Sequence, residues 1–517
     1  MFKRLSRILN KNRSRKSNGD LGEDTHDEIE IENLLFLSDL HLGEGCKNVS
    51  RMEYLKRSDG LDRHVTSFLE HFTEHRIDGR PWRLILGGDL LDFLQVTMTP
   101  SEATESEAKY GLGSSESQSV WKLERLFERH RITFVHLADF IGRGNRIEVL
   151  QGNHDAELFW PRVREEFVEL LGEIYFGKES GAGCTRQQFI SSITFHPWYF
   201  YIPGLIYAEH GHRFDEFCST LPQLCPLRPE KEEELVQPLS AVAIQYFANL
   251  EVGFATHDKE HWGLADYVRY FKGGGLPRAI ELCTRYASLA YHSIRYHLEN
   301  GRYTSEHAQN THQDGLRALA TDGDIPLEQL EALDGMTPRN VMGSFLDVAA
   351  NVCLGELAAL TVTLLTCLGT LIAGLPWLTT LSIVTATAFL SFGAAFANRR
   401  RYDRNIRGKL EKAANGISQL IDAPIVCFGH SHAPKLQRME HNHRYHYVNS
   451  GSFLRPHGAQ HEPGMPCACR HTFMMLEQPD RFTFPQPQLM NWCPVERVAA
   501  PLDMASSLVV SRKAPDR

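Results

Sequence analysis

Five short apolar segments of this chain are each followed at once by residues of the types that bind metal ions. The first segment covers residues 34–37 and predicts a buried strand. Asp39 and His41 come directly after it, and residues two apart on an extended chain point to the same side. A carboxylate and an imidazole therefore face one place at the end of a strand, where α/β proteins commonly form their binding sites.

Four further segments repeat this arrangement along the chain. Their polar ends are Gly88-Asp89-x-x-Asp92 after residues 82–87, Gly152-Asn153-His154-Asp155 after 146–150, His210 after 205–208, and Gly429-His430-x-His432 after 424–428. A polar loop after a strand is the ordinary interpretation of any one of them. Five in succession on one chain point instead to a single shared site, and the helical periodicity between the strands predicts an α/β fold.

Length, charge and cysteine content narrow the class of protein. A chain of 517 residues is too long for one ordinary core and indicates two or three modules. The net charge of −9 does not favour nucleic acid as a partner. The cysteines number 11 and are scattered, which indicates a reducing compartment without a disulfide framework. Cys467 and Cys469 form a C-x-C pair that fits either free thiols or a structural zinc site.

The N-terminal segment is basic and is followed by an acidic stretch at residues 20–32. Seven Lys or Arg fall within residues 1–16, beside apolar residues that could share one helical face. This segment fits either a disordered basic tail or a helix that rests on anionic lipid. The acidic stretch predicts a linker, so residues 1–32 are expected to form a tail.

Taken together, the five motifs resemble those of the calcineurin-like metallophosphoesterases, over roughly residues 33–215 and 420–455. The matching residues are Asp39, His41, Asp89, Asn153, His154, His210, His430 and His432. The resemblance implies a four-layer αββα sandwich, in which two packed sheets are flanked by helices. Within the family, the spacing around His210 and the G-H-x-H motif looks closest to bacterial UDP-2,3-diacylglucosamine pyrophosphohydrolases, which are much shorter and lack the long insertion present here.

The resemblance also implies two divalent metal ions that share one ligand, Asp89. One ion would be held by Asp39, His41, Asp89 and His432, and the other by Asp89, Asn153, His210 and His430. The residue types agree, because nitrogen and oxygen ligands without thiolates suit Mn, Fe or Zn better than Ca or Mg. Mn²⁺ is the expected metal. Two such ions beside two carboxylates leave positive charge that attracts phosphate and gives a bridging hydroxide near neutral pH.

His154 is expected to act beside the metals, where it stabilises phosphoryl oxygens or protonates the leaving group, as in the family. Asp155 could orient it and Asp92 could support the ligands, although a turn or helix-cap carboxylate is an equally good interpretation of both. His212 is the alternative to His210 as ligand. Other residues near the motifs are interpreted more simply: Arg213 and Arg455 as surface residues that could otherwise meet phosphate, and His441, His443 and His446 as an exposed cluster.

The region between His212 and His430 predicts a large insertion. Residues 357–398 include no charged residue, which is close to two membrane spans with a turn at 374–377. Arginines from Arg399 onward place that flank on the cytoplasmic side. A buried helical pair or a dimer contact is the alternative. Residues 216–350 predict a helical cap whose aromatic residues either line an acyl groove or form core (Tyr246, Phe247, Phe254, Trp262, Tyr267, Tyr270 and Phe271).

These expectations combine into one hypothesis. The phosphoesterase domain is expected over residues 33–215 and 415–480, with the cap at 216–350, a transmembrane hairpin at 351–400 and a C-terminal tail at 481–517. The protein is expected to be a membrane-anchored phosphohydrolase on the cytoplasmic side that cleaves a phosphoester or pyrophosphate, for example of a lipid-linked substrate, by attack of the bridging hydroxide. The alternatives are a soluble nucleotide phosphodiester or phosphoprotein substrate, or a non-catalytic scaffold.

Overall fold

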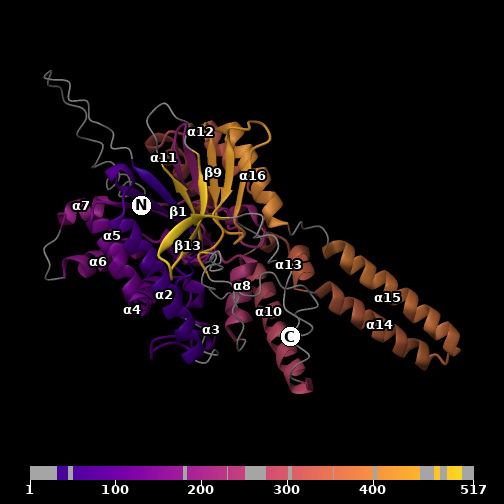
Figure 1. Cartoon of the computed structure of the whole chain (residues 1–517). Coiled ribbons are helices and arrows are strands. Elements are labelled where there is room, and N and C mark those ends of the chain that lie inside the picture. The colour runs from indigo at the N-terminus through magenta and orange to yellow at the C-terminus, as the bar shows by residue number, and fades with distance from the viewer. Residues whose placement is uncertain are drawn as a thin grey trace.

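The structure is a computed structural model, and it combines helices and two large sheets (Figure 1). The residues that it describes are 32–44, 51–177, 183–229, 231–250, 275–300, 305–352, 354–399, 405–454, 471–477 and 486–502. The prediction of a mixed α/β fold is confirmed. Outside the described residues lie the basic segment, the C-x-C pair, Arg455 and the cap aromatics from Phe254 to Phe271.

The first sheet has seven strands in the order β14-β13-β12-β1-β2-β3-β4. They are β1 (Asn33–Leu37), β2 (Trp82–Gly87), β3 (Arg146–Leu150), β4 (Ile193–His196), β12 (His471–Leu476), β13 (Gln488–Cys493) and β14 (Val498–Pro501). Strands β1 to β4 are parallel, whereas β12 to β14 join antiparallel. The carboxyl ends of β1, β2 and β3 therefore meet at one edge of the sheet.

The second sheet has five strands in the order β10-β11-β9-β6-β5. They are β5 (Tyr199–Ile202), β6 (Ile206–Glu209), β9 (Ile425–Phe428), β10 (Lys435–Arg438) and β11 (His446–Asn449). Strand β9 pairs in parallel with both β6 and β11. This pairing brings the segments after β6 and β9 together, although more than two hundred residues separate them in the chain.

Alternate side chains of the strands build the layers. In β1, Leu34 and Phe36 join a core shared with residues of the five-stranded sheet such as Ile425. Leu35 and Leu37 face the opposite way, into a core shared with helices. All five residues of β1 are buried, as expected for a strand covered on both faces.

Helices cover the outer face of each sheet (Figure 1). Over the seven-stranded sheet lie α2 (Arg51–Glu74), α4 (Glu116–Arg129), α5 (Arg131–Gly142) and α6 (Pro161–Phe176). Over the five-stranded sheet lie α11 (Glu306–Asp322), α12 (Leu327–Asp334) and α16 (Ile406–Leu420). Short helices α3 (Glu105–Tyr110) and α7 (Arg186–Ser191) and a small hairpin of β7 (Leu227–Arg228) and β8 (Lys231–Leu235) complete the body.

Two local expectations are corrected by the structure. The periodicity over residues 120–141 looks like one helix, but the helix breaks at His130, whose buried ring bonds Asp62 and the carbonyl of Gly43. The C-terminal tail predicted at 481–517 is wrong for Gln488–Pro501, which form β13 and β14 of the large sheet. Strand β13 has no polar–apolar alternation to mark it, because Leu489 packs into the core between the sheets and Trp492 into the core under the helices.

The insertion continues with α8 (Leu239–Tyr246), α10 (Gly275–Asn300) and α13 (Phe345–Asn351), and then with two long helices. These are α14 (Leu354–Ile372) and α15 (Trp377–Arg399), which pack side by side and project from the body (Figure 1). Among the described residues, one helix, α15, is long and apolar enough to cross a membrane, over Trp377–Ala394. The apolar stretch of α14, Ala358–Ile372, is shorter. A hairpin of two spans stays a prediction.

The C-terminal strands can be tested through Trp492, which is fully buried against Phe68 and donates to Ser67. Trp492→Ala is expected to lower the free energy of unfolding by about 3–5 kcal/mol, because it leaves a cavity in the core. Val498→Ala, on the exposed side of β14, is the control and should change it by less than about 0.5 kcal/mol. Chemical denaturation in detergent measures both. Equal effects would contradict the placement of β13 in the core.

Candidate metal centre

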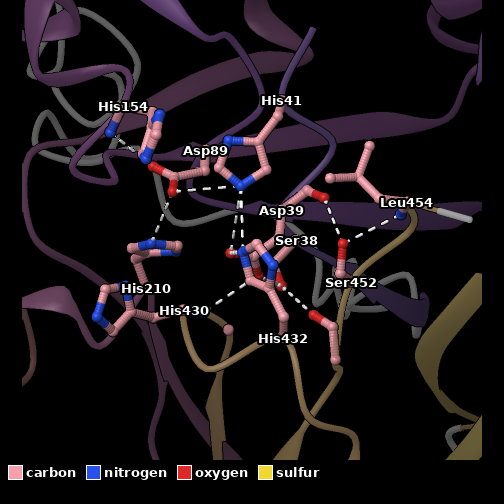
Figure 2. Close-up of polar contacts among 12 residues, drawn as sticks. Ser38, Asp39, His41, Asp89, His154, His210, His430, His432, Ser452 and Leu454 are labelled. Carbon is pink, nitrogen blue, oxygen red and sulfur yellow. Dashed lines mark hydrogen bonds and ion pairs between the residues drawn. The ribbon is translucent and has the colours of Figure 1, made fainter. Parts of the chain in front are cut away.

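Five loops meet where the two sheets pack together (Figure 2). Three follow β1, β2 and β3, and two follow β6 and β9. Backbone hydrogen bonds join neighbouring loops: the N–H groups of Asp39 and His41 donate to Gly88 and Asp89, and Gly429 donates to His210. These hydrogen bonds hold neighbouring loops to one another.

The backbone of this site is strained in a consistent way. Seven non-glycine residues in the described part of the chain have a positive φ, and five of them are predicted ligands. These are Asp39, His41, Asp89, His430 and His432, with φ between 48° and 64°. A non-glycine residue in this region costs about 1–2 kcal/mol. Such strain persists where the surrounding structure imposes it, typically at functional sites.

The first predicted ligand set comes together around Asp39. His432 Nε2 lies 3.0 Å from Asp39 Oδ1 and 3.2 Å from His41 Nε2. His41 Nε2 also lies 3.8 Å from Asp89 Oδ2. Three ligand atoms of these residues, Asp39 Oδ1, His41 Nε2 and His432 Nε2, therefore converge on one place.

The second set comes together around His210. Its Nε2 lies 3.2 Å from Asp89 Oδ2 and 3.2 Å from Asn153 Oδ1, so two oxygen atoms face the same ring nitrogen. The other ring nitrogen, Nδ1, donates to the carbonyl of Gly87 at 3.0 Å. Ligating histidines usually donate their second N–H in this way. Asp89 Oδ2 is therefore the atom shared between the His41 side and the His210 side.

His430 differs from its predicted place. Its Nε2 lies 3.3 Å from Asp215 Oδ2, and Asp215, Cys218 and His430 form a group of their own that could hold an ion. The ring is nevertheless adjacent to the second set, with its centroid 5.3 Å from that of His210. The structure therefore places His430 beside the second ligand set but directs it to Asp215, a residue with no motif to mark it.

The predicted contact between Asp155 and His154 is corrected. His154 Nδ1 lies 3.1 Å from Asp92 Oδ1, and the other oxygen of Asp92 lies 3.6 Å from His41 Nδ1. Asp155 instead accepts backbone N–H groups of Gly152, Leu90 and Leu91. Asp92 thus orients two imidazoles, whereas Asp155 fastens the loop after β3 to the loop after β2.

The electrostatics of the site favour positive charge. Burial is the largest influence on Asp39 and opposes its ionisation, yet His432 and His210 together outweigh it and lower the pKa of Asp39 to about 2. Burial also disfavours charged histidine, yet Asp89 raises the pKa of His210 to about 9. Asp92 and Asp89 raise the pKa of His154 to about 9 against the same opposition. Carboxylates that raise the pKa of neighbouring histidines in this way also attract divalent cations, which can replace the protons on the imidazoles.

The donor set fits two divalent ions. Ligand atoms bound at about 2.1 Å to one metal at right or tetrahedral angles lie about 3.0–3.5 Å from one another. The His432–Asp39, His41–His432, His210–Asp89 and His210–Asn153 separations fall in this range. The atoms are imidazole nitrogens and carboxylate or amide oxygens, which suit Mn, Fe or Zn. Asp39, His41, Asp89, Asn153, His210 and His432 therefore have the spacing and chemistry to hold metal, and His154 lies within reach of His41 and Asp89.

Glycine is required where the loops approach one another most closely. A Cβ atom on Gly152 would lie 2.1 Å from Asp89 Oδ1. Gly88 has φ +88°, and a Cβ there would lie 2.6 Å from the ring of His210. The glycine of each motif therefore has a steric role: it allows the ligands of the neighbouring loop to reach the site.

Other residues near the motifs have structural places. Arg213 is buried, bonds Glu209 and donates to the carbonyl of Leu333, so its interpretation as a surface residue is wrong. His212 lies next to His210, and burial lowers its pKa well below the usual value. His441 and His443 are exposed as predicted, but His446 is buried in β11.

A support behind Asp39 could not be found from metal-ligand patterns. Ser38 Oγ donates to Asp39 Oδ2 and meets Ser450 Oγ at 2.7 Å, and Ser452 donates to the carbonyl of Asp39. Asn449 donates to the carbonyl of Gly429. The signal in the sequence was the polar run 449–452 after a strand, which carries no chemistry of its own.

Comparison with models of protein families, with curated proteins and with solved structures finds no match to this chain. The interpretation of the site therefore depends on its own geometry and chemistry.

Metal binding is tested by Asp89→Asn. The wild-type chain is expected to bind about two divalent ions, and the variant to bind less, because the shared carboxylate of both sites loses its charge. Asp78→Asn is the matched control, since Asp78 is exposed and has a similar φ of 53°. Metal analysis after dialysis against Mn²⁺ gives the stoichiometry. Unchanged binding in Asp89→Asn would contradict a centre built on this residue.

Proposed function

We propose that the protein is a dimetal phosphohydrolase of the calcineurin-like type, anchored in a membrane, that cleaves a phosphoester or pyrophosphate bond. The observation that carries the proposal is the pair of donor clusters that share Asp89 Oδ2. The arrangement of two packed sheets between layers of helices supports the same family assignment. Mn²⁺ is the proposed metal, with Fe or Zn as alternatives.

When bound, two such ions polarise phosphoryl oxygens and supply hydroxide near neutral pH. The residues of the chain do the rest. Asp39, His41, Asp89, Asn153, His210 and His432 would hold the ions, and His430 would contribute to the second set, beside which its ring lies. The Nδ1–H group of His154 points to Asp92, which holds the ring in place. The other ring nitrogen, Nε2, would then face the leaving group and donate a proton to it.

The membrane anchor is the second part of the proposal. The α14–α15 hairpin exposes large apolar side chains along both helices, including Leu365, Ile372, Leu378 and Phe389 at 62%, 78%, 58% and 79%. Exposure of so large an apolar surface to water is unfavourable, whereas contact with lipid acyl chains is favourable. The apolar stretch of α15, Trp377–Ala394, has 18 residues and rises about 27 Å, close to the thickness of a bilayer core. Both ends of the hairpin join the catalytic body, which places that body on one side, proposed to be the cytoplasmic side.

A membrane anchor favours a lipid-linked phosphate or pyrophosphate as substrate over a soluble nucleotide or phosphoprotein. A substrate panel distinguishes them: p-nitrophenyl phosphate, bis-p-nitrophenyl phosphate and lipid pyrophosphates, assayed with Mn²⁺ and the full chain in detergent. Hydrolysis of none of them, by protein that binds metal, would favour the non-catalytic scaffold.

His154→Gln is expected to lower kcat by about 100- to 10,000-fold, because it removes the proton donor. Bound metal should stay unchanged, since His154 is not a proposed ligand. His196→Gln is the matched control: His196 also pairs with a carboxylate, Glu148, at 2.8 Å, but outside the site. A loss of metal in His154→Gln, or equal loss of kcat in both variants, would count against this role.

A further inference from the structure

Exposed apolar side chains gather at the base of the hairpin. Outside the hairpin of α14, α15 and the turn between them, nine large apolar side chains of the described residues are exposed. Four of them lie on two adjacent helices: Tyr291 and Leu298 on α10, and Phe345 and Leu346 on α13, with exposures between 45% and 62%. The other five are spread over the catalytic body and the C-terminal strands.

These four side chains, with Arg295, form one face. Tyr291, Arg295 and Leu298 are spaced four and seven apart and therefore share one side of α10. Another side of α10 is used for packing, where Ala290 and Ile294 pack against a buried cluster that includes Val348 of α13. Phe345 reaches α10, with its ring 6.0 Å from that of His297. The face, called the collar, is therefore an outward surface of a packed pair of helices.

The collar is continuous with the hairpin. Helix α13 packs against both α14 and α15, and only two residues separate it from α14 (Figure 1). The collar combines an aromatic ring with a hydroxyl, an arginine and large aliphatic groups. This mixture is typical of the water–lipid boundary, where Tyr lies at the headgroups and Arg extends its charge toward water.

We propose that the collar lies in the headgroup layer of a phospholipid bilayer, at the side where the hairpin enters. This rests on the proposed membrane anchor and adds a defined orientation of the enzyme to it. The continuity of the collar with the hairpin favours lipid over a second copy of the chain as its occupant. Substrates that suit such a site keep their apolar part in the bilayer and present phosphate at the headgroup level.

The structure connects this surface to the metal centre through Glu216. Its carbonyl accepts the N–H of Val341, just before α13, and its carboxylate pairs with Lys409 in α16. The preceding residue, Asp215, contacts His430. The chain before and after the hairpin therefore contacts a residue next to the site, which relates the position of the site to that of the collar.

The test places a photoreactive benzoylphenylalanine at Leu298 or Leu346 of the full chain, in vesicles of phosphatidylcholine and phosphatidylglycerol. Lipid adducts are expected at both positions. The controls are Ile132 and Ile190, exposed at 51% and 40% on the catalytic body, where no lipid adduct is expected. Phe389 on α15 is the probe of the anchor itself.

Each outcome decides something different. Adducts at 389 without adducts at 298 and 346 would overturn the collar and leave the anchor in place. No adduct at any position would reject the anchor and the collar together. Cross-links at 298 or 346 that join two chains would show an interface between copies and overturn the lipid assignment.

A second experiment tests the contact between the collar and lipid by placing charged side chains in the collar. Leu298→Glu with Leu346→Glu should lower the yield of lipid adduct from a probe at Tyr291 on the order of tenfold, because carboxylates resist transfer from water. The matched control carries Glu at Ile132 and Ile190 and should leave the yield unchanged. An unchanged yield in the collar variant would contradict the proposal, provided that the probe at Phe389 still reacts.

Discussion

The site depends on two buried carboxylates, Asp39 and Asp89, held where two apolar sheets meet. Buried negative charge of this kind is unfavourable unless positive charge lies close to it. The surrounding histidines can supply this positive charge by binding protons, as the raised pKa values of His154 and His210 indicate. Divalent metal ions would compensate the carboxylates more fully. Much of the local design, from the left-handed backbone to the close glycines, serves to bring these charges together from separate loops.

The ligand-bearing residues could be predicted because each signal is local. A strand followed by Asp, Asn or His is readable within a few residues, and parallel pairing then brings the strand ends together without further information. The structure groups Asp39, His41, Asp89, His210 and His432 as that logic expects. The mixed α/β fold followed from the same strands and from the helices between them.

What could not be predicted depends on contacts between distant segments. Asp92 and Asp155 are both acidic and both next to a motif, and only the path of the loop after β2 decides that Asp92 meets His154. Nothing next to Arg213 in the sequence distinguishes it from a surface arginine. It is buried because α12, more than a hundred residues away, covers it and offers the carbonyl of Leu333 as an acceptor. Strand β14 has a weak pattern because it is the edge strand of its sheet and is largely exposed, and β13 shows no polar–apolar alternation because both of its faces are partly buried. His430 contacts Asp215, which no motif marks.

The position of the insertion in the chain limits how often the insertion could cross a membrane. Strands β6 and β9 are adjacent in the five-stranded sheet, and the whole cap and hairpin lie between them in the chain. A single crossing would separate β6 from β9 and destroy the second ligand set. In the proposed membrane-anchored enzyme the hairpin must therefore return to its starting side. Glu216 contacts the chain before and after the hairpin, at Val341 and Lys409. Under this proposal, membrane attachment and assembly of the metal centre would share these contacts, so a change in one would affect the other.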